Sequence, residues 1–234
     1  MSQASEAPAE RRRRFTPYAD APRLPAGEAL GIEQILARPP VVGEAAPGSS
    51  PSRLELEIGP GRGGFLLERL AVCPEVCIVG LEIRLKWASL VDQRLHELGF
   101  AGRGRVFAED IRTALPRVAS GSLSRVFVHF PDPWWKKRHA KRRLATDGVI
   151  TEIARLLADA GELFVQTDVW ESADAYRQAI ESHPDFLPDG DAPGSPLLSE
   201  NPYGARSPRE RRVISAGLPV VRLRYRRGVR AGAG

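Results

Sequence analysis

The sequence has few cysteines and no long apolar run. Only Cys73 and Cys77 occur, too few for a disulfide framework and without the further Cys or His pair that a zinc site requires. We therefore expect no metal ion and interpret both cysteines as small core residues. No apolar run approaches the length that spans a bilayer, and no apolar signal segment opens the chain. These absences favour a cytoplasmic protein that does not enter the membrane.

Bulky apolar side chains are also scarce in residues 1–26, which are rich in Ala, Pro, Glu and Arg. Such a segment cannot bury enough surface to offset the entropy lost on ordering, so we expect a disordered basic arm. Residues 27–52 are predicted to form a short helix over 28–37 and then a linker rich in Pro, Gly and Ser. Residues 53–230 have the length and composition of one globular domain.

Positive charge is present in excess and is clustered. The chain carries a formal net charge of +5 and has a pI near 9.6. The clusters lie at 11–14, 136–143, 206–212 and 222–230. A basic surface of this kind favours a polyanion such as RNA as the partner.

Strand and helix patterns alternate from residue 53 onward. This alternation predicts an α/β fold with a mostly parallel sheet and helices on both of its faces. The expected strands are 54–58, 76–81, 105–108, 125–130 and 163–166, with an antiparallel strand at 220–225. The expected helices are 65–71, 84–98, 146–158 and 171–181. The proline-rich residues 184–205 are predicted to form an irregular excursion near the site.

A glycine-rich loop follows the first expected strand, in the sequence EIGPGRGG that contains Glu57, Gly59 and Gly61. Glycines between a strand and a helix let the backbone approach a nucleotide-type cofactor, although a tight structural turn is an alternative. Glu82 ends the second strand, where a carboxylate can accept both ribose hydroxyls, and Asp110 follows the third strand, where it can accept from an adenine amino group. Glu57 would attract the cationic amino-acid end of S-adenosyl-L-methionine and repel a pyrophosphate, which favours this cofactor over a dinucleotide.

Asp132 follows the fourth expected strand, between Pro131 and Pro133. The prolines cannot continue a sheet ladder, so they end the strand and hold Asp132 in a stiff loop. In open α/β sheets, the loops at the carboxyl ends of the strands carry the functional site. Asp132 is therefore a candidate functional residue, and the cationic run that follows it is a candidate phosphate-binding segment.

The stretch FPDPWWKKRHAKRRL, residues 130–144, closely resembles the tRNA (guanine-N7)-methyltransferases of the bacterial type. Glu57-Ile-Gly59 and Gly80-Leu-Glu82 resemble the cofactor motifs of this family, and Gln166-Thr-Asp168 resembles its Thr-Asp motif. The resemblance covers roughly residues 53–183. It implies a Rossmann-like class I methyltransferase fold with a seven-stranded sheet. It also implies methyl transfer from S-adenosyl-L-methionine to guanine N7 in the variable loop of tRNA, at position 46.

The resemblance also implies roles for individual residues. It assigns the cofactor to Glu57, Gly59, Gly61, Glu82, Asp110 and Asp132, the substrate to Lys136, Asp168, Ser207 and Glu210, and the catalytic role to Asp132. The cationic run adds tRNA phosphate contacts at Lys137, Arg138, Lys141, Arg142 and Arg143. The family's usual Thr-Lys-Phe-Glu motif is replaced by Ser-Pro-Arg-Glu at 207–210, where a solvated basic loop is the alternative.

Other functions remain open from the residues themselves. Pro-Asp-Pro-Trp also resembles the motif of amino methyltransferases, which would modify N2 of guanine or N6 of adenine in RNA. An RNA-binding protein with a vestigial cofactor fold is a non-enzymatic alternative. A dehydrogenase would leave the cationic run unexplained. We expect a monomer, with a homodimer as the alternative.

Overall fold

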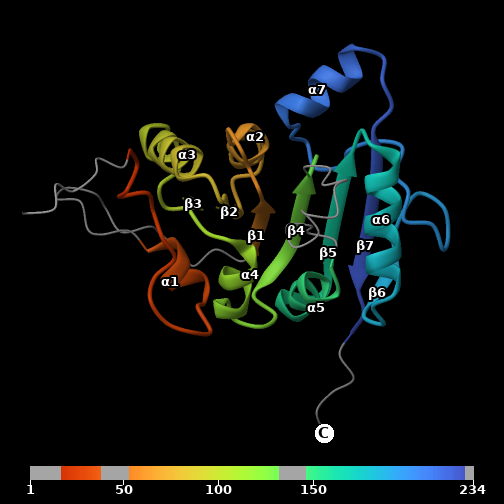
Figure 1. The fold of residues 1–234 in the computed structure, drawn as a ribbon, viewed down its shortest axis with the longest axis horizontal. Helices are drawn as coiled ribbons and strands as arrows, with labels where there is room; N and C mark the ends of the chain where they lie inside the picture. The colour runs from red at the N-terminus through yellow and green to blue at the C-terminus, as the bar shows by residue number, and fades with distance from the viewer. Residues whose placement is uncertain (1–16, 38–52, 132–145, 230–234) are drawn as a thin grey trace, which may run out of the picture.

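A twisted sheet forms the centre of the computed structural model, which describes residues 17–37, 53–131 and 146–229. Within these ranges the sheet has seven strands in the order β3-β2-β1-β4-β5-β7-β6 (Figure 1). The strands are β1 (Arg53–Ile58), β2 (Val76–Leu81), β3 (Gly104–Phe107), β4 (Leu123–His129), β5 (Leu157–Thr167), β6 (Phe186–Pro188) and β7 (Val221–Arg227). Strands β1 to β5 pair in parallel, and β7 is antiparallel to both β5 and β6. The predicted fold class is confirmed.

Helices cover both faces of this sheet. They are α1 (Ile32–Leu36), α2 (Gly64–Val72), α3 (Leu85–Glu97), α4 (Ile111–Ala114), α5 (Asp147–Leu156), α6 (Trp170–Glu181) and α7 (Pro208–Ser215). Helices α2 and α3 contribute to the apolar core on one face, and α4, α5 and α6 contribute to the core on the other. Helix α7 lies beyond the carboxyl ends of β4 and β5 (Figure 1).

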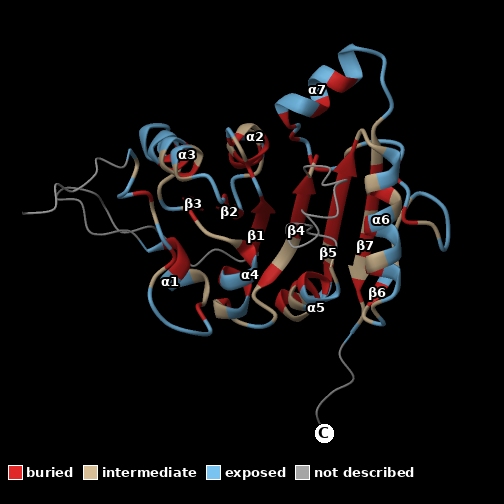
Figure 2. Ribbon diagram, in the orientation of Figure 1, coloured by how far each residue is buried: buried red, intermediate tan, exposed pale blue. Residues whose placement is uncertain are grey.

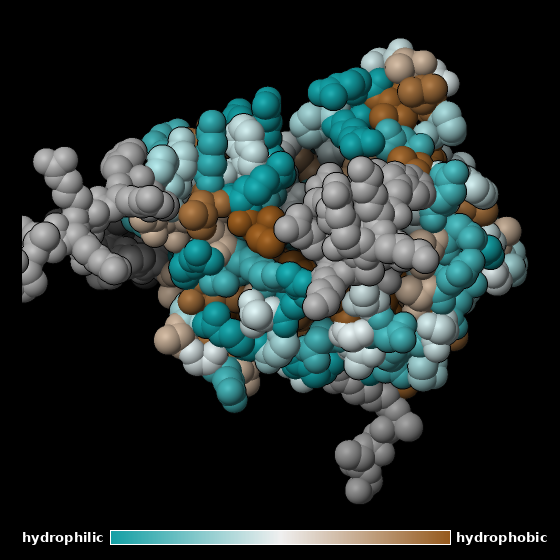
Figure 3. All heavy atoms as spheres, in the orientation of Figure 1, coloured by the Kyte–Doolittle hydropathy of each residue, from teal (hydrophilic) through white to brown (hydrophobic). Residues whose placement is uncertain are grey.

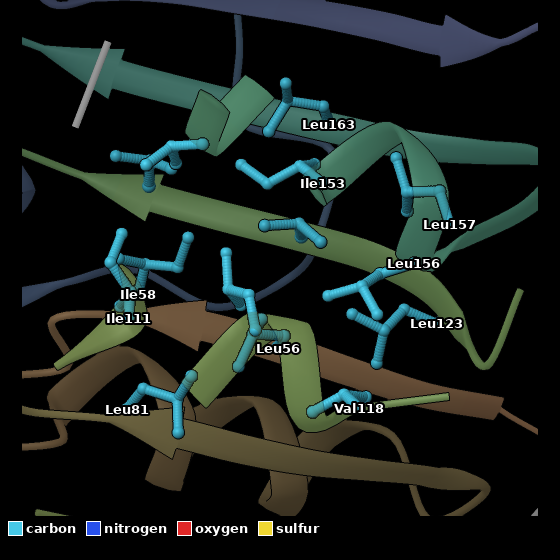
Figure 4. Close-up of a cluster of buried hydrophobic side chains, with 14 of the residues drawn as sticks. Leu56, Ile58, Leu81, Ile111, Val118, Leu123, Ile153, Leu156, Leu157 and Leu163 are labelled. Carbon is cyan, nitrogen blue, oxygen red and sulfur yellow. The ribbon is translucent and has the colours of Figure 1, made fainter. Parts of the chain in front are cut away.

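The core explains why these segments fold as they do. Val149, Ile150, Ile153 and Leu156 recur at helical spacing in α5, and all four are buried. Figure 4 shows Ile153 of α5 between Leu163 of β5 and Leu56 of β1. Strand β2 is buried along its whole length, as expected for an inner strand of a parallel sheet (Figure 2). Each large apolar side chain buried in this way contributes about 1.5–3 kcal/mol to folding.

A buried ion cluster lies on the α2 face of the sheet. Glu55 is fully buried and accepts hydrogen bonds from Arg69 at 2.8 Å and from Arg125 at 2.9 Å. Arg125 also donates to Glu162 at 3.0 Å, and Tyr203 Oη donates to the same Glu162 oxygen at 3.0 Å. Burial alone would raise the pKa of Glu162, but the charge of Arg125 and the hydrogen bonds from Arg125 and Tyr203 together lower it. The cluster fastens the segment around Tyr203 to the sheet.

The structure contains elements that the sequence patterns did not predict. Helix α7 occupies the segment for which a solvated basic loop was the alternative, and the short strand β6 lies within the predicted excursion. Residues 17–26, assigned above to the arm, lie against the domain, since Ala21 and Leu24 are buried and Ala108 N–H donates to Pro22 O at 2.7 Å. The domain boundaries themselves stay a prediction. In the described ranges, no helix is long and apolar enough to cross a membrane.

Candidate functional site

The glycine loop and Glu82 meet at the carboxyl ends of β1 and β2. Gly59 and Gly61 have φ angles of 69° and 56°, in the left-handed region that favours glycine. Glu82 is buried, and its Oε2 accepts a hydrogen bond from Gly61 N–H at 2.9 Å. Its Oε1 accepts from the backbone and side chain of Arg84, both at 3.0 Å. The loop and the carboxylate predicted to share a cofactor therefore lie in direct contact.

Asp110 lies next along this edge, after β3. Its Oδ1 caps the short helix α4 by accepting from Arg112 N–H at 3.0 Å, and the Arg112 guanidinium donates to both carboxylate oxygens. The hydrogen bond from the Arg112 side chain is the main reason that the pKa of Asp110 lies below its ordinary value. Asp110 is thus held as an anion at the end of its strand.

Glu57, near the end of β1, is buried and has one oxygen available. Its Oε1 lies 2.9 Å from His129 Nδ1 on β4, and its Oε2 has no hydrogen-bond partner among the described residues. A buried carboxylate oxygen without a partner is costly, so it is a candidate to receive a hydrogen-bond donor from a ligand. The ammonium group of an amino acid fits this requirement.

The chain leaves β4 through a strained residue. Phe130 has a φ of 47°, which is uncommon for a non-glycine residue, and its N–H donates to Gln166 O on β5 at 2.7 Å. This turn ends at Pro131, the last described residue before a gap. Seven predicted site residues lie outside the described residues: Asp132, Lys136, Lys137, Arg138, Lys141, Arg142 and Arg143.

Asp168 directly follows β5, as predicted, and is joined to α7. Arg209 Nη2 lies 2.9 Å from Asp168 Oδ1 and 3.0 Å from Oδ2. The same guanidinium lies 5.4 Å from the centroid of the Phe130 ring. Arg209 thereby connects the ends of β4 and β5, the strands whose following residues were predicted to face the substrate.

Ser207 and Glu210, also predicted to contact the substrate, have structural contacts here. Ser207 caps α7, and its Oγ accepts from Glu210 N–H at 3.1 Å. Glu210 is fully buried and accepts from Asn201 at 3.0 Å and from Arg222 at 3.1 Å. These contacts fix the start of α7. Their assignment to the substrate stays a prediction.

Helix α7 is also attached to α2. A Cβ atom added at Gly64 would lie 2.4 Å from Pro208 Cδ, so the two helix starts are in close contact. Arg211 Nη2 lies 2.5 Å from Glu68 Oε1. Burial would raise the pKa of Glu68, but hydrogen bonds from the Arg211 side chain and the Arg206 backbone, together with both charges, lower it. The C-terminal helix is therefore tied to the helix that follows the glycine loop.

The outer surface of this end of the sheet is basic. Arg84 and Lys86 at the start of α3 are exposed, as are Arg206, Arg211 and Arg212 on and before α7. Figure 3 shows hydrophilic side chains over α3 and over much of α7. Such a surface suits a polyanion.

In the described ranges, no group of His, Cys, Asp or Glu side chains could hold a metal ion.

The structure thus brings Glu57, Gly59, Gly61, Glu82 and Asp110 to one edge of the sheet and places Asp168 on the same edge. Three further residues lie at these strand ends and on α7 without a role predicted from the sequence: His129, Gln166 and Arg209. His129 offered a signal, because it is the one polar side chain in the apolar run Val-Phe-Val-His-Phe. No local sequence pattern indicated that Arg209 would pair with Asp168.

Comparison with known proteins gives consistent matches. A family model described as "Putative methyltransferase" matches residues 52–223. A tRNA (guanine-N(7)-)-methyltransferase of Synechococcus sp. (strain JA-3-3Ab) is 36% identical over 170 residues, covering 72% of this chain and 70% of that protein. One from Myxococcus xanthus is 35% identical over 198 residues, covering 84% of this chain and 94% of that protein.

A solved structure supports the fold. Geranyl diphosphate C-methyltransferase from Streptomyces coelicolor, in complex with S-adenosyl-L-homocysteine, aligns with a TM-score of 0.51 at 11% identity. The alignment covers 76% of this chain and 74% of that one. At this identity the similarity shows the Rossmann-like methyltransferase fold alone.

Proposed function

The chain belongs to the family of tRNA (guanine-N(7)-)-methyltransferases, and from this premise we propose that it transfers a methyl group from S-adenosyl-L-methionine to guanine N7 in tRNA. The target we propose is the guanine at position 46, in the variable loop. The observation that carries the proposal is the hydrogen bond between Gly61 N–H and Glu82 Oε2, which joins the glycine loop to the carboxylate that we propose for the ribose. We further propose that the enzyme acts in the cytoplasm.

The residues at the strand ends suit this cofactor, which would supply an electrophilic methyl group. Glu57 would accept from its ammonium group through Oε2, and Glu82 would accept from its ribose hydroxyls. Asp110 would accept from the adenine amino group, and Asp132 would complete this side of the site. The left-handed glycines of the loop keep side chains away from the space that a ligand would occupy.

The chemistry requires positioning more than proton transfer. Guanine N7 carries a lone pair and no proton, so it can attack the methyl carbon while the sulfur retains the electron pair of the broken bond. No general base is needed, and the base gains positive charge. Asp132 and Asp168 would accept hydrogen bonds from N1–H and the 2-amino group, which holds N7 toward the methyl group and stabilises the developing charge.

The basic residues would bind the rest of the tRNA. We propose that Lys136 contacts the substrate and that Lys137, Arg138, Lys141, Arg142 and Arg143 bind phosphates. The arm residues 11–14 would add to this attraction, and Ser207 and Glu210 would complete the substrate side through α7. Such binding depends steeply on salt, because each phosphate contact releases counterions.

The test is to incubate the protein with labelled S-adenosyl-L-methionine and total tRNA and then map the modified base. We expect N7-methylguanosine in the variable loop, where reduction and aniline treatment cleave the chain. Label in a base that resists this cleavage would instead indicate an exocyclic amino product. Asp132→Ala should abolish transfer and retain most tRNA binding, and normal turnover of this variant would contradict a positioning role.

A further inference from the structure

A row of buried polar side chains crosses four strands beneath α7. Glu57 on β1 contacts His129 on β4, which is in register with Gln166 on β5, which is in register with Arg222 on β7. All four are buried, with exposed fractions between 0% and 9%. Among the described residues, Glu57 Oε2, His129 Nε2, both polar atoms of the Gln166 amide and Arg222 Nε have no hydrogen-bond partner. Buried polar atoms normally have partners, so this row points to a ligand-binding function.

His129 lies in an aromatic enclosure within this row. Its ring centroid is 4.2 Å from that of Phe65 on α2, 5.7 Å from Phe127 on β4 and 5.9 Å from Phe164 on β5. These rings bury the imidazole and restrict the orientation of its plane. A hydrogen bond in such surroundings is stronger than one exposed to solvent.

The geometry makes the two oxygens of Glu57 different. An ionised carboxylate only accepts hydrogen bonds, so the imidazole donates from Nδ1 to Oε1 across 2.9 Å. This contact fixes the carboxylate and leaves Oε2 without a partner. A phenylalanine at position 129 could retain the ring packing but could not hold Glu57.

We propose that His129 is a positioning residue for the cofactor: it holds Glu57 by one oxygen so that the other is presented to the amino group of S-adenosyl-L-methionine. The inference rests on the proposed function, because it takes the ligand from it. It adds a residue on β4 whose effect is limited to the amino-acid end of the ligand. The adenosine end, bound by Glu82 and the glycine loop on the far side of β1, should not be affected.

Two ligands distinguish binding at the amino-acid end from binding at the adenosine end. S-adenosyl-L-homocysteine carries the amino-acid end, whereas 5′-methylthioadenosine has the same adenosine and sulfur without it. Calorimetry on the full chain would measure both dissociation constants for the native protein, for His129→Phe and for His129→Asn. The asparagine amide can place a donor near the position of Nδ1, so it serves as the conservative variant.

We expect His129→Phe to weaken S-adenosyl-L-homocysteine binding about tenfold or more, the effect of losing a hydrogen bond to a charged group. Binding of 5′-methylthioadenosine should stay within about twofold, and His129→Asn should recover most of the lost affinity. Equal weakening of both ligands, or no weakening of either, would overturn the inference. If the phenylalanine variant does not fold, His129→Leu gives the same reading, because it also lacks the donor.

A double-mutant cycle tests independently whether His129 acts through Glu57. If His129 acts through Glu57, then His129→Phe should weaken S-adenosyl-L-homocysteine binding little further in a Glu57→Gln background. Fully additive losses would contradict action through Glu57. A native protein that binds neither ligand would refute the cofactor, and with it the proposed function. Native binding of both ligands, with equal weakening or no weakening in His129→Phe, would refute the inference alone.

Discussion

Arg209 on α7 donates to both carboxylate oxygens of Asp168, at 2.9 and 3.0 Å, and thereby holds the residue that follows β5. A carboxylate has about four lone-pair positions, so Asp168 can keep this partner and still accept hydrogen bonds from a base. Arg209 also lies against the ring of Phe130, which ends β4. The position of Asp168 therefore depends on a helix that is distant from it in the sequence.

Removing this guanidinium should impair substrate recognition. We expect Arg209→Ala to raise the KM for tRNA about fivefold, which corresponds to the roughly 1 kcal/mol that a partly exposed ion pair contributes at most. The kcat should change less. Steady-state kinetics would measure both values. Arg212→Ala is the matched control, since it removes an exposed charge from the same helix without touching Asp168. An equal rise in KM in the control would show that only the charge matters.

Acid should loosen the attachment of α7 to α2. The pKa of Glu68 is lowered in the folded protein, so its pairing with Arg211 stabilises the fold above the unfolded value near 4.5. That contribution is lost as the pH falls through the lower folded pKa. Thermal unfolding of the native protein and of Glu68→Gln should differ at pH 7 and converge in acid. Glu75→Gln, at an exposed position before β2, is the matched control for the loss of a surface carboxylate.

The side chain of Gln166 should lower the free energy of unfolding and support methyl transfer. This side chain is fully buried, and neither polar atom has a partner among the described residues. Since an unsatisfied buried polar group costs about 1–3 kcal/mol, Gln166→Leu should raise the free energy of unfolding by about 1 kcal/mol and lower methyl transfer. Denaturant titration and a transfer assay would measure the two effects. Gln178→Leu, exposed on α6, should change stability by less than about 0.5 kcal/mol. A destabilised but fully active Gln166→Leu would contradict this role.

The contact between Gly64 and Pro208 should be sensitive to a single methyl group. Gly64→Ala places a Cβ 2.4 Å from Pro208 Cδ, so we expect a loss of about 1–3 kcal/mol in the free energy of unfolding. Pro208→Ala in the same chain should restore part of it. Gly148→Ala on α5 is the matched control: no atom lies within 4 Å of the added Cβ, so stability should rise by up to about 1 kcal/mol. A neutral Gly64→Ala would show that α7 can shift at little cost.

The parts of the site that the sequence predicted are those encoded locally. Gly59, Gly61 and Glu82 were predictable because strand patterns, glycine and a terminal carboxylate identify a loop at a sheet edge whatever the rest of the chain does. The position of Asp168 after β5 followed from the same reasoning. These are consequences of the α/β alternation, which is visible in one sequence.

The parts that escaped prediction depend on distant partners. Helix α7 begins at a proline and is rich in arginine. Its buried residues are Val213 and Glu210, and Glu210 accepts a hydrogen bond from Arg222 on β7. Strand β6 is three residues long and exists only because β7 lies beside it. No periodicity within either segment indicates these contacts.

The contact of Pro208 with Gly64 has a consequence for how such a protein can change over time. A larger residue at the start of α2 requires a smaller or displaced one at the start of α7. Substitutions at the start of α2 and at the start of α7 are therefore not independent of each other. The Ser-Pro-Arg-Glu segment at 207–210 thus restricts which residues can follow the glycine loop at position 64.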